Sequence, residues 1–114
     1  MIHPMVAELL EQCPFLEDHL DPKFSDLPTV AFGAAATALK ERTLTLAQED
    51  QLFGHFNTVA AKGSPNDLDT LGTGAIELFN DDRAAQRLAR AKLNGRAREM
   101  LEEFRVAWGQ PDYG

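Results

Sequence analysis

The three histidines of the chain are the first candidates for acid–base or metal chemistry. They are His3, His19 and His55. No two of them have the H-x-x-x-H or H-E-x-x-H spacing that places two metal ligands on one helical face. The segment EDHLD, residues 17–21, gathers hard and borderline ligands, but such clusters at a helix end are usually solvated surface. We expect no metal and no cofactor, and we interpret His55, beside Phe53 and Phe56, as a partly buried structural histidine.

Serine and cysteine nucleophiles are scarce. The chain has only Ser25, Ser64 and Cys13. Ser25 lies in a proline-bounded loop, Ser64 precedes a proline where a helix should begin, and Cys13 falls on an apolar stripe. A serine or cysteine nucleophile needs a neighbouring base to activate it, and no such pair is visible. We therefore expect no catalytic residue and a non-enzymatic protein.

The stretch TLGTGAIELF, residues 70–79, contains the glycine pattern closest to a phosphate-binding turn. A dinucleotide fingerprint reads G-x-G-x-x-G after a strand, and a P-loop needs Gly-Lys followed by Ser or Thr. Here Glu77 occupies the third glycine position, and Ser64 already caps a helix upstream. Two glycines cost a helix roughly 2 kcal/mol in propensity. We interpret Gly72 and Gly74 as marks of close helix packing or local distortion.

A basic run, RAAQRLARAKLNGRAR, covers residues 83–98. It has six basic residues among sixteen and no acidic residue. Arg83, Arg87 and Arg90 share one helical face, and Arg96 and Arg98 lie near the start of the next helix. Such a surface could hold an anion from nucleic acid or from a partner's carboxylates. We favour the alternative, in which these arginines pair with the chain's own acids while their stems cover apolar surface.

Acidic residues dominate the rest of the chain. Residues 1–82 carry 14 acidic and 4 basic side chains, a balance of −10, whereas residues 83–114 carry 7 basic and 4 acidic ones. Paired acids lie near predicted helix ends at 17–21, 49–50 and 81–82, either as one continuous acidic edge or as separate solvated caps. This balance disfavours nucleic acid, which repels like charge. It favours a basic protein partner, or serves solubility alone.

Apolar residues recur at helical spacing almost throughout, and no strand-like alternation of useful length appears. Proline, serine and glycine signals divide the pattern into predicted helices near 4–13, 28–42, 46–62, 66–79, 83–92 and 96–108, with one more short turn before residue 20. We expect a single all-α domain of about five to six helices, either an irregular bundle or a short helical-repeat-like stack. Residues 1–27 would form the N-terminal helix and loop, 28–108 the helical core and 109–114 a frayed tail.

The location of the protein is predicted from three features. The single cysteine allows no internal disulfide and fits a reducing compartment. The N-terminal stretch MIHPMVAELLEQC has no basic start and carries two glutamates, unlike a signal peptide. No run reaches the roughly 20 apolar residues that a membrane span needs. We expect a cytoplasmic protein without a membrane partner.

Two segments, EDQLFGHFNTVAAKGSPNDLDTLGTGAIELF and LNGRAREMLEEFRVAW, resemble a loose family of small, acidic, all-helical bacterial proteins. Some members of that family look like immunity proteins of polymorphic toxin systems. The resemblance spans Leu46 to Trp108 and rests on structural rather than catalytic motifs. This chain departs from the pattern at Asn94, which is inserted in the Leu-Gly turn. Glu77 is the one position that the resemblance carries over, without an assigned role.

The resemblance implies an immunity or inhibitor protein that neutralises a cognate bacterial toxin in the cytoplasm by blocking a basic surface or active site. The partner-binding candidates are Glu17, Asp18, Asp21, Glu49, Asp50, Glu77, Asp81 and Asp82. The alternative is a regulatory or adaptor domain that binds an acidic protein or nucleic acid. Its anion-binding face would consist of Arg83, Arg87, Arg90, Arg96 and Arg98.

Overall fold

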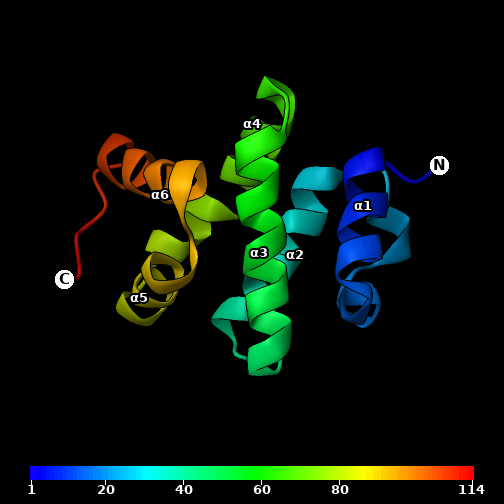
Figure 1. Ribbon diagram of the computed structural model, residues 1–114, viewed down its shortest axis with the longest axis horizontal. Coiled ribbons are helices and arrows are strands. Elements are labelled where there is room, and N and C mark those ends of the chain that lie inside the picture. The colour runs from blue at the N-terminus through cyan, green and yellow to red at the C-terminus, as the bar shows by residue number, and fades with distance from the viewer.

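All regular structure in the computed structural model, which describes residues 1–114, is helical (Figure 1). The elements in chain order are α1 (Pro4–Gln12), η1 (Pro14–His19), η2 (Pro22–Phe24), α2 (Pro28–Lys40), α3 (Leu46–Lys62), α4 (Pro65–Gly74), η3 (Ile76–Asn80), α5 (Arg83–Lys92) and α6 (Gly95–Ala107), where η denotes a short 3-10 helix. The all-α prediction is therefore confirmed. None of the helices has the length and apolar character that crossing a membrane requires.

The helices form three groups along the long axis of the molecule, which measures 40 × 30 × 22 Å (Figure 1). The N-terminal group consists of α1, η1 and η2. The central group contains α3 with α2 behind it and α4 near its upper end, and α5 and α6 form the group at the other end. The chain termini consequently lie at opposite ends. Helix lengths and directions differ between the groups, as in an irregular bundle.

Local side-chain caps set several helix starts, as the sequence predicts. The Thr45 hydroxyl accepts the Gln48 N–H at 3.1 Å, and the Gln48 side chain accepts the Thr45 N–H at 3.0 Å. Ser64 and Asp67 form the equivalent reciprocal pair at the start of α4. The Asp82 carboxylate accepts the Ala85 N–H at 2.8 Å before α5. Each cap satisfies backbone donors that the first helical turn leaves free.

Small residues bring α2 and α4 together at the centre of the fold. A Cβ atom added to Gly33 would lie 3.3 Å from the Gly74 carbonyl oxygen, and one added to Gly74 would lie 2.9 Å from the Thr29 carbonyl oxygen. A Cβ on Gly72 would lie 2.6 Å from the Phe104 ring of α6. The prediction that these glycines mark close helix contacts is confirmed.

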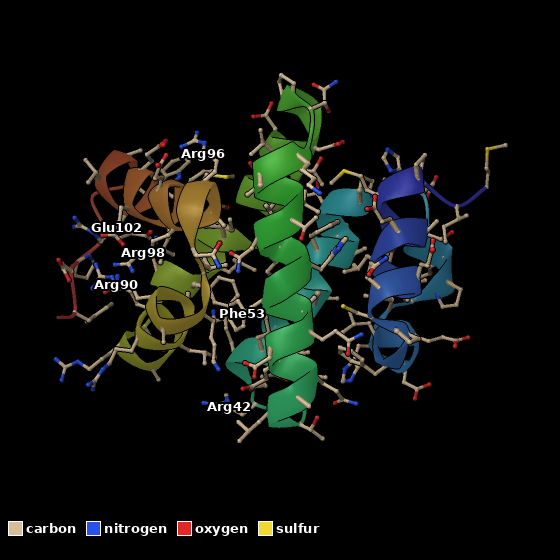
Figure 2. The ribbon with its side chains drawn as sticks, viewed as in Figure 1. Arg42, Phe53, Arg90, Arg96, Arg98 and Glu102 are labelled. Atoms are coloured by element: carbon tan, nitrogen blue, oxygen red, sulfur yellow. The ribbon has the colours of Figure 1, made fainter.

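Four buried phenylalanines fill the space around this contact. They are Phe32, Phe53, Phe56 and Phe79. Three ring pairs among them have centroids 5.6 to 6.2 Å apart, within the range of favourable aromatic contacts. Phe53 extends from α3 toward the α5–α6 group (Figure 2). The central and C-terminal groups therefore share one core.

The helix predicted over residues 66–79 is wrong in its second half. The α-helix ends at Gly74, Ala75 has φ −125° and ψ −58°, and the chain continues as the 3-10 helix η3. The two glycines weaken the helix, and Gly74 lies directly against the backbone of α2. The tighter turn that follows places Ile76 and Phe79 in the core, where both are fully buried.

The last six residues also differ from the frayed tail that the sequence predicts. The buried Gln86 amide donates to the Pro111 carbonyl at 3.0 Å and accepts the Tyr113 N–H at 2.9 Å. Asp112 pairs with Arg90 at 2.7 Å. These contacts link the tail to α5 from residues more than twenty positions away.

Candidate functional site

The predicted acid Glu49 is not a surface residue. Its side chain is 1% exposed and accepts two hydrogen bonds from the Arg42 guanidinium, at 2.7 Å from Nε and 3.1 Å from Nη2. Arg42 reaches it from the turn after α2, where its φ is +56°. Figure 2 shows Arg42 beside the N-terminal end of α3. Glu49 is a structural anchor for this turn and is not available to a partner.

Three further candidate acids already have partners within the chain. Asp50 pairs with Lys92 at 2.5 Å, and Asp81 pairs with Lys40 at 2.9 Å. Asp82 accepts the backbone hydrogen bond that begins α5. Because these charges are bound internally, the three predicted acidic clusters do not form one continuous free edge.

Glu77 lies half-buried in η3 and makes no ion pair. Burial is the main cause that raises the pKa of its carboxyl group, and the nearby Asp81 charge raises it further. Together with Leu78, Trp108 and Gln110, these two acids line an open hollow of about 380 Å³. Glu77, the position singled out by the family resemblance, is thus a partly buried acid in a hollow that the exposed Trp108 indole also lines. The second acid of the hollow, Asp81, is already paired with Lys40.

Most of the candidate arginines are also neutralised by the chain itself. Arg90 donates to Glu102 at 3.0 and 3.2 Å and to Asp112 at 2.7 Å, and these bonds raise its pKa above the ordinary value. The same Arg90 bond is the first cause that lowers the pKa of Glu102. Arg98 donates to the Arg90 carbonyl and lies 3.8 Å from Glu102. Figure 2 shows Arg90, Arg98 and Glu102 gathered between α5 and α6.

Arg96 completes this internal pairing through Glu99 and Glu103. Internal pairing, the favoured interpretation of the basic run, is therefore confirmed for Arg90, Arg96 and Arg98. Only Arg83 and Arg87 are exposed and make no ion pair. The predicted anion-binding face is reduced to these two charges on the first two turns of α5.

The candidate acid–base and nucleophilic residues make no hydrogen bond to one another. Burial raises the pKa of the Cys13 thiol to about 11, which leaves it protonated and weakly nucleophilic at neutral pH. The Ser64 hydroxyl caps α4. Burial lowers the pKa of His55, which lies against the Phe32 ring and lines a cavity of about 150 Å³. His55 shares its cavity with Asp67, the cap partner of Ser64, but no hydrogen bond joins His55 to Ser64 or to Cys13.

The N-terminal group holds a feature that the sequence reasoning missed, an apolar groove of about 510 Å³ between α1, η1, η2 and α2. We call it the N-terminal groove. The residues that line it are Ile2, Val6, Leu10, Glu17, His19, Leu20, Asp21, Pro22, Phe24, Ser25, Val30, Ala31 and Ala34. Its available signal was Phe24, a large apolar residue within segment 21–28, which was interpreted only as a loop.

Two acids, Glu17 and Asp21, line this groove. Residues 1–28 carry six acidic side chains and one lysine, a balance of −5 in a chain of net charge −7. Their one ion pair joins Asp21 and Lys23 at 3.6 Å, with both side chains at least half exposed. Such an exposed pair contributes little. Of the predicted acidic sites, the one at Glu17, Asp18 and Asp21 thus combines exposed apolar surface with two carboxylates that make no ion pair, those of Glu17 and Asp18, whereas Asp21 also accepts the Lys23 N–H at 3.1 Å.

These features define a small helical protein in which seven of the twelve acids after residue 28 pair with a lysine or arginine, whereas only one of the six acids in residues 1–28 does. No known protein family, curated protein or solved structure matches the chain. Its function therefore has to be inferred from its own fold and surfaces.

Proposed function

We propose that the chain is a non-enzymatic binding protein of the immunity type, which neutralises a cognate bacterial toxin in the cytoplasm by covering a basic surface or active site. The observation that carries this proposal is the unneutralised acid of residues 1–28 beside exposed apolar side chains. Acids elsewhere in the fold are largely bound to the chain's own lysines and arginines.

The N-terminal end has the dimensions and chemistry of a protein interface. The molecule is 30 by 22 Å across its long axis, a cross-section of about 660 Å². This area is of the same order as the roughly 800 Å² that each partner contributes to a standard interface. Specific interfaces combine an apolar centre with a polar rim. An acidic rim accelerates encounter with a basic partner and disfavours acidic competitors. Inhibition by coverage needs no catalytic group.

The test is capture of the product of the adjacent upstream gene. We expect that product to be toxic when expressed alone, to be tolerated with this chain, and to bind it more weakly as salt rises. The double variant Glu17→Lys, Asp21→Lys should lose both binding and protection. The matched control Arg83→Glu, Arg87→Glu also reverses two exposed charges and should keep both. If no neighbouring product is toxic in the absence of this chain, the proposal is wrong.

The second candidate function is an adaptor that binds an acidic protein or nucleic acid through α5. Exposed Arg83 and Arg87, which have no internal partner, favour it. Two phosphate contacts with a single strand give a log–log salt dependence with a slope of only about −1.4. Binding of a short single-stranded DNA at low salt, abolished by Arg83→Glu, Arg87→Glu, would support this function. Absence of binding at low salt would exclude the nucleic-acid form.

A further inference from the structure

We infer that the N-terminal groove receives an amphipathic helix of the partner, with large apolar side chains inserted between α1 and α2 and with lysine or arginine on its flanks. This inference rests on the proposed function, because it specifies how the basic partner is held. Helix-in-groove recognition places apolar anchors at i, i+3, i+4 and i+7 along one face of the bound helix.

The floor of the groove is made of small and buried side chains. Val6 of α1 and Ala31 of α2 are almost fully buried beneath it, and Ala34 lies one helical turn beyond Val30 on the same face of α2. The run of small residues in α2 therefore has two effects. Gly33 lets α4 approach on one side, and the alanines leave room for inserted side chains on the other.

The walls of the groove expose large apolar side chains to water. Ile2 is 43% exposed, Phe24 36% and Val30 44%. They are three of the eight large hydrophobic residues that the surface exposes, and they line the same groove. Grouped apolar exposure with a polar border is typical of an interaction site, whereas single exposed apolar residues are ordinary.

The charge around the groove determines the chemistry of the occupant. Glu17 and Asp21 belong to its lining, and the N-terminal segment 1–28 as a whole has a balance of −5. A basic helix gains attraction from this field. Two grooves facing each other in a symmetric dimer would oppose their acids, and an anionic lipid surface would be repelled. The charge thus favours a cationic protein segment over a second copy or a membrane.

The experiment uses the full chain and a 14-residue peptide made only of leucine and lysine, with leucines at helical spacing. A permuted peptide of the same composition, with the leucines spread around the helix, is the control for charge alone. We expect the amphipathic peptide to bind about tenfold more tightly or better, since one buried apolar anchor contributes at least ~1.4 kcal/mol. Methyl NMR signals of Val6, Val30, Ala31 and Ala34 should shift on binding.

Two exposed valines supply matched variants. Val30→Lys places a polar cation in the groove wall, and Val106→Lys makes the same change on α6, at the opposite end of the molecule. We expect Val30→Lys to weaken peptide binding about tenfold or more and Val106→Lys to leave it within about twofold. Glu17→Gln with Asp21→Asn should reduce the salt dependence of binding. Circular dichroism checks that each variant is folded.

Four results would overturn the inference. They are equal binding of the permuted peptide, signal shifts confined to α5 and α6, unchanged binding by Val30→Lys, and a dimer at micromolar concentration that Val30→Lys disperses. The last would assign the groove to a second copy. If a toxin binds the chain and Val30→Lys does not weaken that binding, the groove is not the binding site, but the proposed function is retained. If no neighbouring product is toxic but the amphipathic peptide binds selectively in the groove, the proposed function is wrong and the assignment of the groove as a helix-binding site is retained.

Discussion

Arg42 occupies a backbone position that normally suits glycine, and this conflict gives a sharp stability prediction. The Arg42 N–H donates to the Leu39 carbonyl and the Thr43 N–H donates to the Ala38 carbonyl, each at 3.2 Å. Together with the φ of +56° at Arg42, these bonds form the glycine-favouring turn that commonly ends helices. A non-glycine residue pays about 1 kcal/mol there. The bidentate bond to buried Glu49 offsets that cost.

The predicted magnitudes follow from exposure. Removing one partner of a fully buried ion pair costs about 3–5 kcal/mol, but the Arg42 side chain is 55% exposed, so solvent screening reduces the loss to about 2 kcal/mol. Arg42→Ala should therefore destabilise the fold by ~2 kcal/mol. Arg42→Gly loses the same ion pair but relieves about 1 kcal/mol of backbone strain, so its net cost in the free energy of unfolding should be ~1 kcal/mol.

The assay is urea unfolding followed by circular dichroism, with melting temperature as a second measure. Each kcal/mol should shift the melting temperature by about 4 °C in a domain of this size. Arg83→Ala, an exposed arginine without an ion pair, is the control and should change stability by less than ~0.5 kcal/mol. Equal costs for the alanine and glycine variants would refute the strain argument. No cost for either would refute the structural role of the Arg42–Glu49 pair.

Three further predictions concern the centre of the fold and the tail. Gly74→Ala should cost about 1–3 kcal/mol in urea unfolding because its Cβ meets the α2 backbone, whereas Gly54→Ala, with open space around its Cβ, should gain up to ~1 kcal/mol. Burial lowers the pKa of His55 in the folded state, so the unfolded chain binds its proton more readily. Stability should fall as pH drops below about 6.5, and His55→Gln should flatten that fall between pH 7.5 and 5. Deleting residues 109–114 removes two hydrogen bonds from buried Gln86 and should cost ~1–2 kcal/mol; an unchanged urea midpoint would show that the tail contributes nothing.

Features that depend on a few neighbouring residues were predictable from the sequence. The Thr45–Gln48 and Ser64–Asp67 caps each form within one helical turn, so spacing alone identifies them. The predicted start of α5 was likewise correct, since Asp82 lies just before an uninterrupted helical pattern. The sequence predicted that Arg90 pairs with an acid of the same chain, but it did not predict which acid. The choice of Glu102 and Asp112 depends on how α6 and the tail pack against α5.

Features that depend on distant contacts were not predictable. The end of α4 at Gly74 reflects the approach of Thr29, 45 positions earlier in the chain. The tail is held by the buried Gln86 amide, and its partners Pro111 and Tyr113 lie more than twenty positions away, so local sequence patterns could not identify them. The groove arises because α1, η2 and α2 enclose it together. In the sequence its walls correspond to an amphipathic helix, a proline-rich loop and a run of small residues. None of these three common patterns indicates that the segments lie side by side.

The glycine contact between α2 and α4 has a mechanical consequence for the groove on the other side of α2. Because Gly74 meets backbone atoms of Thr29 rather than a pliable side chain, α2 cannot move toward α4 without a steric clash. The α2 wall of the groove therefore cannot move outward to widen the groove. Any widening that accommodates a bulkier partner side chain has to come from the other walls, formed by α1 and by the segment around η1 and η2 that carries Leu20 and Phe24. Tolerance for partner side chains of different size is thus expected in the walls formed by residues 2–25 rather than in α2.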